Sequence, residues 1–112
     1  MRKLVHFVPI KRIITQKRLR EYARNYPPAK ASLLHWEKTV LAAVWTSPSD
    51  LKQSFNDVDP VKVGSGNTVY VFNIARNAHR LIAAIHFNTE MVFVLRIMTH
   101  REYDRGHWKE EL

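Results

Sequence analysis

The sequence has no cysteine and no long apolar run. The lack of cysteine excludes disulfides and thiolate metal sites, and it is compatible with a reducing compartment. The longest apolar stretch, Met91 to Leu95, is far too short to span a bilayer. The start of the chain lacks a long apolar region and a small-residue cleavage site, so no signal peptide is expected. We therefore expect a protein of the cytoplasm that does not bind a membrane.

The motifs of several enzyme classes are missing as well. No P-loop, Gly-rich dinucleotide fingerprint or G-x-S-x-G elbow occurs. The histidines show no ligand spacing such as H-x-x-x-H, and there is no HExxH-type motif. We therefore expect no metal ion and no other cofactor.

Positive charge is abundant, and it is unevenly distributed. The formal net charge is +8; residues 1–30 hold nine Lys or Arg against one acid, whereas residues 31–112 hold nine of each. Such asymmetry suits contact with a phosphate backbone, an acidic protein or an anionic surface. The alternative is a basic face that is only solvated.

The length of 112 residues favours a single domain over the whole chain, 1–112. In its first half, Thr15 is predicted to cap an amphipathic helix that ends near Asn25. A second helix is predicted from about Pro28 to Trp45, and a third begins with Ser47 as cap and Pro48 at its first position. The first helix has a basic face, formed by Lys17, Arg20 and Arg24, and the second has two apolar rows, formed by Leu33, Val40 and Val44 and by Leu34, Leu41 and Trp45.

After Pro60 the pattern changes to the alternation typical of strands, predicted at 61–63, 69–73, 80–87 and 91–98. Short connections force neighbouring strands to be antiparallel. Thr99 and Glu102 form a capping box that opens a short C-terminal helix, which Gly106 can close. The predicted fold is α+β: an N-terminal strand at Ile13-Ile14 and helices pack on an antiparallel sheet of about four strands.

Strand parity brings polar side chains to one edge. A hairpin centred near Thr89 places Arg80 across from Met98, with Arg96 as its diagonal neighbour on the same face. His100 and Tyr103 follow just beyond that strand. The opposite face is predicted to be the core, formed by Leu81, Ala83, Ile85 and Phe87 with Phe93, Leu95 and Ile97.

Two guanidinium groups, an imidazole and a phenol suit metal-free RNA cleavage. A base takes the proton from a ribose 2′-OH, cations stabilise the charge that develops on the phosphate, and an acid protonates the leaving 5′-oxygen. Arginine holds phosphate in fork geometry and stays charged. The alternative is that the arginines are solvated surface charges and that the imidazole is only a polar group at a helix start.

Three stretches of the chain resemble, in order, the HigB family of RelE-like toxins. They are Trp45, Pro48, Leu51-Lys52 and Phe55; Val71-Phe72-Asn73-Ile74, Asn77 and Arg80-Leu81-Ile82; and Met98 to Asp104, followed by residues to Lys109. With the opening strand and helix, the resemblance covers residues from about 12 to 109. Residues 1–11 have no counterpart and are expected to be an extension or an upstream start.

The resemblance implies a RelE-like fold and endonucleolytic cleavage of translated mRNA on the ribosome. It also implies a HigA-like antitoxin with a helix-turn-helix domain, through which alone the complex would bind operator DNA. The matched polar positions are Arg80, His100 and Tyr103. Arg96 stands one position after a residue that is basic in many relatives and is Leu95 here, and Lys62 stands where RelE-like enzymes place phosphate-binding lysines. We expect the basic face of the first helix, formed by Lys17, Arg20 and Arg24, to contact ribosomal RNA or the acidic side of the antitoxin.

Two other functions remain open at this point. The departure at Leu95 favours a non-catalytic RelE-like module that binds RNA or the antitoxin. A DNA-binding regulator acting alone is poorly supported, because the sequence shows no helix-turn-helix pattern.

Overall fold

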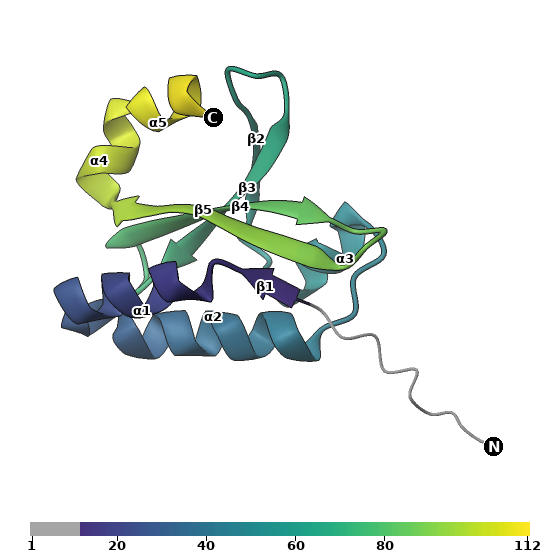
Figure 1. Cartoon of the computed structure of the whole chain (residues 1–112), viewed down its shortest axis with the longest axis horizontal. Coiled ribbons are helices and arrows are strands. Elements are labelled where there is room, and N and C mark those ends of the chain that lie inside the picture. Colours follow the sequence, from purple (N-terminus) through teal and green to yellow (C-terminus); the bar gives the residue numbers. More distant parts are fainter. Residues whose placement is uncertain (1–11) are drawn as a thin grey trace.

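The computed structural model of the chain describes residues 12–112 (Figure 1). The expected extension at residues 1–11 lies outside the described residues. No helix within residues 12–112 is long and apolar enough to cross a membrane. The elements in chain order are β1 (Arg12–Ile14), α1 (Gln16–Asn25), the 3-10 helix η2 (Pro27–Ala29), α2 (Lys30–Ala42), α3 (Pro48–Ser54), β2 (Asp59–Lys62), β3 (Thr68–Ile74), β4 (His79–His86), β5 (Met91–Thr99), α4 (His100–Arg105) and α5 (His107–Glu111).

The strands of residues 12–112 form one five-stranded sheet in the order β1-β5-β4-β3-β2. The expected antiparallel pairing holds for β2 to β5, but β1 joins the edge as a fifth strand, parallel to β5. The predicted α+β class is confirmed, and the fifth strand that extends the predicted sheet of about four is the predicted N-terminal strand. The pairing of Arg80 with Met98 is confirmed. The register beside the β4–β5 turn would by itself pair Arg80 with Ile97, and one extra residue in β5 shifts the pairing to Met98.

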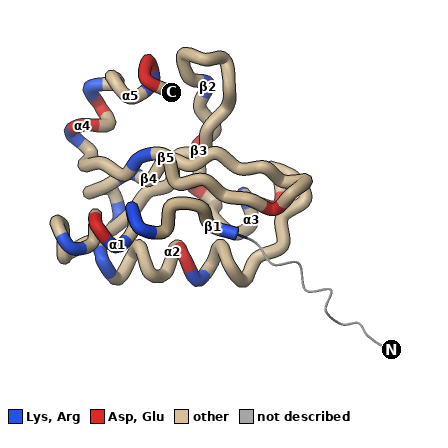
Figure 2. Tube along the Cα trace, viewed as in Figure 1, with Lys and Arg blue, Asp and Glu red and all other residues tan. Residues whose placement is uncertain are grey.

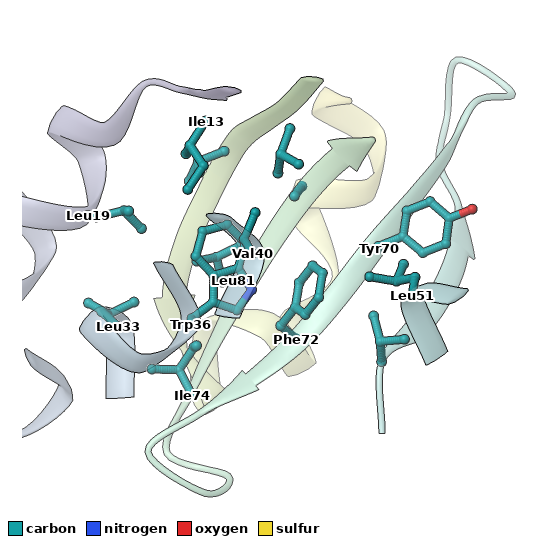
Figure 3. Close-up of a cluster of buried hydrophobic side chains, with 14 of the residues drawn as sticks. Ile13, Leu19, Leu33, Trp36, Val40, Leu51, Tyr70, Phe72, Ile74 and Leu81 are labelled. Atoms are coloured by element: carbon teal, nitrogen blue, oxygen red, sulfur yellow. The ribbon is translucent and has the colours of Figure 1, made fainter. Parts of the chain in front are cut away.

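The helices α1, α2 and α3 cover one face of the sheet and form the main core with it (Figures 1 and 3). Helix α2 contributes Leu33, Trp36 and Val40, which recur at the i, i+3, i+7 spacing of one helix face. The ring of Trp36 meets that of Phe72 edge-to-face, with centroids 5.5 Å apart.

The second helix is shorter than predicted. It ends at Ala42, because Ala43 has extended backbone angles (φ −84°, ψ 154°). Trp45 is buried outside the helix, and its indole N–H donates to Ser54 Oγ at 2.9 Å. The two predicted apolar rows were therefore partly wrong: Leu34, Leu41 and Val44 are exposed.

The predicted helix caps have different outcomes. Ser47 accepts a hydrogen bond from the Asp50 N–H, and Thr99 and Glu102 form the complete capping box. Thr15 precedes α1 but does not cap it with its side chain, because its hydroxyl donates to Val94 O on β5 at 3.1 Å. Its left-handed backbone (φ 66°) turns the chain from strand to helix.

The other face of the sheet is covered only in part, by α4 and α5 (Figure 1). Trp108 of α5 packs there in a second, smaller core with Val63, Val69, Val71, Ile82 and Met98. The turn between β2 and β3 also contacts α5: Gly64 N–H donates to Lys109 O at 2.8 Å. A Cβ atom at Gly64 would lie only 3.1 Å from that oxygen. The predicted closing residue, Gly106, ends α4 with φ 79°, and the second short helix follows it.

The predicted core face was right for β4 and wrong for the first half of β5. Val92 and Val94 are buried in the main core, whereas Leu95 packs against the second core. A β-bulge explains the difference: Ile82 pairs with Arg96 and Ala83 pairs with Val94, so Leu95 is the extra residue. The bulge reverses the parity, and as a result Arg96 faces the same side as Arg80.

Candidate active site

Arg80 lies at the start of β4 on the partly covered face, between Asn73 of β3 and Met98 of β5. Its Nη1 donates to the carbonyl oxygens of Asn77 (2.9 Å) and His79 (3.2 Å). The guanidinium carbon lies 5.4 Å from the centre of the Tyr103 ring, which is a cation–π contact. These contacts hold the half-buried guanidinium in place and leave other N–H groups for a ligand.

A pocket of roughly 360 Å³ opens beside Arg80. This volume lies within the range of small-ligand sites, and the pocket lies on the face opposite the main core. Its side chains come from α3, β2, β3, β4 and α4 and from the loop before β2. They are Lys52, Asp57, Val58, Asp59, Val71, Asn73, Arg80 and Tyr103.

The pocket contains both signs of charge. Lys52 Nζ donates to Val58 O at 3.0 Å, and Asn73 Nδ2 donates to Asp57 Oδ2 at 2.9 Å. Asp59 lines the pocket together with these groups. A phosphate would be attracted by Lys52 and Arg80, and the carboxylates oppose a second anion. This arrangement favours one phosphate held in a defined position over a long phosphate track.

Tyr103 is half-buried, and its ring stacks on Trp108 with centroids 5.1 Å apart. The indole N–H of Trp108 donates to Tyr103 O at 3.1 Å. Burial raises the pKa of the Tyr103 phenol, the charges of Asp59 and Asp104 raise it further, and Arg80 opposes them. The phenol is therefore protonated at neutral pH and can donate a hydrogen bond or a proton.

His100 is the first residue of α4, and its N–H donates to Ala78 O at 2.9 Å. The exposed imidazole places Nδ1 3.0 Å from Asp104 Oδ2, one helical turn on. A proton on Nδ1 would bond that carboxylate and leave Nε2 as an acceptor. His100 does not line the pocket, so the structure brings Arg80 and Tyr103 together and places His100 outside the pocket.

The remaining predicted cations lie outside the pocket. Arg96 faces the same side of the sheet as Arg80, but its Nη2 lies 3.5 Å from Glu111 Oε1. Lys62 alternates with Val61, which packs against the second core, and so Lys62 faces away from the pocket. The predicted basic face of α1, formed by Lys17, Arg20 and Arg24, lies in the helical layer on the other face of the sheet.

Sequence reasoning missed four polar residues of the pocket. Lys52 and Asn73 stand within the stretches that carried the family resemblance, which is the signal that could have found them. Asp57 and Asp59 belong to no motif. They reach the pocket because Asp59 pairs with Val71, which in turn pairs with Ile82, two residues from Arg80.

Within residues 12–112 there is no group of three or more His, Cys, Asp or Glu side chains that could hold a metal ion. The polar groups beside the pocket are a guanidinium, an ammonium, a phenol, an amide and two carboxylates. Acid, base and charge-stabilising roles are the chemistry that these groups can supply.

Comparison with known proteins gives one consistent family. The sequence profile of HigB toxin, described as the RelE-like toxic component of a toxin–antitoxin system, matches residues 29–106. The mRNA interferase toxin HigB of Escherichia coli (strain K12) is 34% identical over 92 residues, which cover 82% of this chain and 86% of that protein. The mRNA interferase HigB of Shigella flexneri gives the same values. The mRNA interferase HigB of Escherichia coli O6:H1 is 30% identical over 93 residues, 83% of this chain and 88% of that protein.

Proposed function

The chain belongs to the HigB family of RelE-like toxins, and on that premise we propose that it is a toxin that inhibits translation by cleaving mRNA. The observation that carries this proposal is the pocket in which Arg80, held by two backbone carbonyls, faces the protonated phenol of Tyr103. A fixed cation and a proton donor on an open face suit an extended chain of nucleotides.

The reaction follows from the chemistry of RNA. A base removes the proton from a ribose 2′-OH, and the oxygen attacks the adjacent phosphorus. The bond to the 5′-oxygen then breaks, and that oxygen takes a proton. Arg80 holds the phosphate and stabilises the charge on its oxygens, with Lys52 as a second cation in the pocket.

Proton transfer is assigned to Tyr103 and His100. The raised pKa keeps the Tyr103 phenol protonated, so it carries a proton that it can give to the leaving oxygen. His100 accepts the 2′-OH proton at Nε2, with Asp104 holding Nδ1. Because His100 stands outside the pocket, the bound RNA would extend from the pocket towards the start of α4.

A non-catalytic binding module was the alternative that Leu95 favoured. The bulge in β5 weakens that reason, because it turns Arg96 to the side of Arg80 and so keeps a cation on this face. We assign Arg96 a supporting role in attracting the RNA backbone, since its guanidinium already lies beside Glu111.

The partners follow from membership of a toxin–antitoxin family. An antitoxin partner belongs to this assignment. We further propose that the antitoxin is HigA-like with a helix-turn-helix domain, and that operator DNA is bound only through the complex. We also propose that the ribosome presents the mRNA, because a chain of 112 residues with one small pocket has little surface of its own to hold an extended RNA. We propose that the toxin acts in the cytoplasm, where ribosomes and mRNA are found.

Expression of the toxin with and without its antitoxin tests the function. Alone, it should stop growth with loss of translated mRNA, and the purified protein should cut ribosome-bound mRNA far faster than naked RNA. Arg80→Ala should remove the effect, whereas Arg76→Gln in the exposed β3–β4 turn is the matched control. Normal growth at confirmed expression of folded protein would contradict the catalytic function. Equal rates on both RNA substrates would contradict only ribosome dependence.

A further inference from the structure

An open groove of roughly 610 Å³ runs between α1 and α2, on the face of the sheet that does not carry the active-site pocket. Its floor is apolar, with Leu19 and Leu33 buried beneath the more exposed Leu34. Its rim is basic, with Arg20 and Arg24 on one side and Lys30 at the start of α2. This surface lies apart from every residue assigned to catalysis.

The charge of the rim is not neutralised within the described chain. None of the ion pairs formed among residues 12–112 involves Arg20, Arg24 or Lys30. The acid that lines the groove, Glu37, accepts a hydrogen bond from Gln16 at 2.8 Å. Figure 2 shows the basic residues gathered along α1 and the start of α2. Like charges four residues apart on a helix repel each other, so an acidic partner would relieve this cost.

Lys17 differs from the other two cations of the predicted basic face. Its Nζ lies 3.7 Å from Glu21 Oε2, one turn along α1, and it does not line the groove. The three cations that sequence analysis grouped together therefore separate into a paired one and two that face the groove. This separation supplies a matched control on the same helix.

Exposed apolar side chains continue from the groove along α2. The large hydrophobic residues that are exposed within residues 12–112 all fall between residues 26 and 44: Tyr26, Leu34, Leu41 and Val44. Leu34 and Leu41 are 48% and 46% exposed and stand seven residues apart, which places them on the same side of the helix. Grouped exposed hydrophobic residues of this kind mark a contact site for another protein.

We propose that the groove between α1 and α2 binds an acidic amphipathic helix of the antitoxin, a proposal that rests on the function proposed above. The apolar side of that helix packs on Leu34 and Leu41, and its carboxylates pair with Arg20, Arg24 and Lys30. RNA fits the rim but not the floor, since the groove residues include no aromatic ring on which a base could stack.

Variants of exposed residues test the proposal with little risk to folding. The probe is the protein encoded by the reading frame beside the toxin gene, and its Kd is measured by calorimetry. Leu34→Glu/Leu41→Glu and Arg20→Glu/Arg24→Glu should each weaken binding by about a hundredfold or more. Ala42→Glu, about 100° further round α2 than Leu41, and Lys17→Glu should stay within about threefold of the parent. Thermal melting confirms that each variant is folded.

A photoreactive residue at position 34 identifies the occupant in cells. A crosslink to an acidic helix of the antitoxin supports the proposal, and a crosslink to RNA or no crosslink overturns it. If the parent binds the antitoxin and both double variants bind equally well, docking in the groove is overturned while the toxin–antitoxin function stands. If the parent neither cleaves mRNA nor binds the antitoxin, the proposed function fails, and this proposal fails with it.

Discussion

The two faces of the sheet differ in how much apolar side chain covers them. Among residues 12–112, the face under α1, α2 and α3 buries sixteen residues in one cluster, whereas the face under α4 and α5 buries six. The face under α1, α2 and α3, called the thick face below, provides most of the hydrophobic stabilisation, which grows with the apolar area removed from water. The face under α4 and α5, called the thin face, leaves room for a pocket with charged walls. We therefore expect substitutions on the thick face to change mainly the free energy of unfolding, and substitutions at the pocket on the thin face to change mainly the rate of cleavage.

The largest effect is expected in the main core. Trp36 is 1% exposed, and Trp36→Ala should lower the free energy of unfolding by about 3–5 kcal/mol through lost burial and the cavity left behind. Urea unfolding followed by circular dichroism measures the loss. Trp36→Phe is the sharper control: the indole Nε1 is buried without a hydrogen-bond partner, so the smaller ring also removes an unsatisfied donor.

We expect Trp36→Phe to cost clearly less than the alanine variant, because most of the ring volume remains. Equal costs for both variants would mean that the indole ring, and not the burial of an aromatic group as such, organises the helical layer.

Arg80 should show the opposite behaviour. Arg80→Ala should reduce single-turnover cleavage of ribosome-bound mRNA by about a hundredfold or more, which corresponds to about 2.7 kcal/mol in the transition state. The free energy of unfolding should change little, because the side chain is only half-buried and opens no core cavity. Arg80→Lys keeps the charge but loses the fork, so its rate should lie between those of the parent and the alanine variant.

A rate within about threefold of the parent for a folded Arg80→Ala variant would place the active site elsewhere, because surface changes that touch no chemistry have effects of that size. Loss of folding in Arg80→Ala would instead show that Arg80 stabilises the fold, and the thin face would then not differ from the thick face in the way proposed.

His100 and Tyr103 are expected to follow. Tyr103→Phe keeps the stacking on Trp108 and the ring beneath Arg80, and it removes only the hydroxyl. Loss of one proton-transfer group typically costs about a hundredfold, so both Tyr103→Phe and His100→Ala should fall in that range or somewhat below it. The pH dependence of single-turnover cleavage distinguishes the two, since only the variant that lacks the base should lose the acidic limb of the profile. Two unchanged profiles would show that neither group transfers a proton.

How much of this picture the sequence could predict depends on the range of the interactions involved. The antiparallel hairpin of β4 and β5 was predictable, because a short turn near Thr89 joins the two strands. The predicted pairing of Arg80 with Met98 is found, but it depends on a bulge that shifts by one residue the register set beside the turn. The bulge at Leu95 was not predictable, because one extra residue in a run of Val, Ile and Leu leaves no mark in the pattern. The end of α2 at Ala42 was missed for a similar reason: the apolar spacing continues, and tertiary burial of Trp45 decides the path.

The candidate site was predicted in the same uneven way. Arg80 and Tyr103 meet as expected, because one lies beside β5 and the other lies one turn into the helix that follows it. The carboxylates of Asp57 and Asp59 arrive through β2 and β3, over sequence separations that local periodicity does not report. Lys62 was placed near the phosphate by resemblance, but the alternation of β2 turns it to the other side.

The smallest expected effect is a change in the free energy of unfolding with pH, and it concerns His79, the first residue of β4. Its carbonyl oxygen accepts a hydrogen bond from Arg80 on the thin face, while its imidazole is 8% exposed among side chains of α1. Nδ1 lies 2.7 Å from Tyr22 Oη, and the rings of Tyr22 and Tyr26 contact the imidazole edge-on. Burial raises the pKa of Tyr22, with Tyr26 and Glu102 adding to the effect, so the phenol remains a donor to Nδ1.

Burial lowers the pKa of His79 below its ordinary value of 6.5. As the pH falls through 6.5 the unfolded chain therefore takes up a proton before the folded chain does, and the free energy of unfolding decreases. The decrease should stop once the pH is below the lowered pKa, and stability should be constant above about pH 7.5 as far as this group is concerned. Urea unfolding of the parent and of His79→Gln between pH 8 and 5 measures the difference, with His35→Gln on the exposed side of α2 as control. If the parent and the His79→Gln variant show the same pH dependence, the contact between α1 and β4 holds no buried neutral imidazole. His79 would then contribute nothing to the pH dependence of the free energy of unfolding in this range.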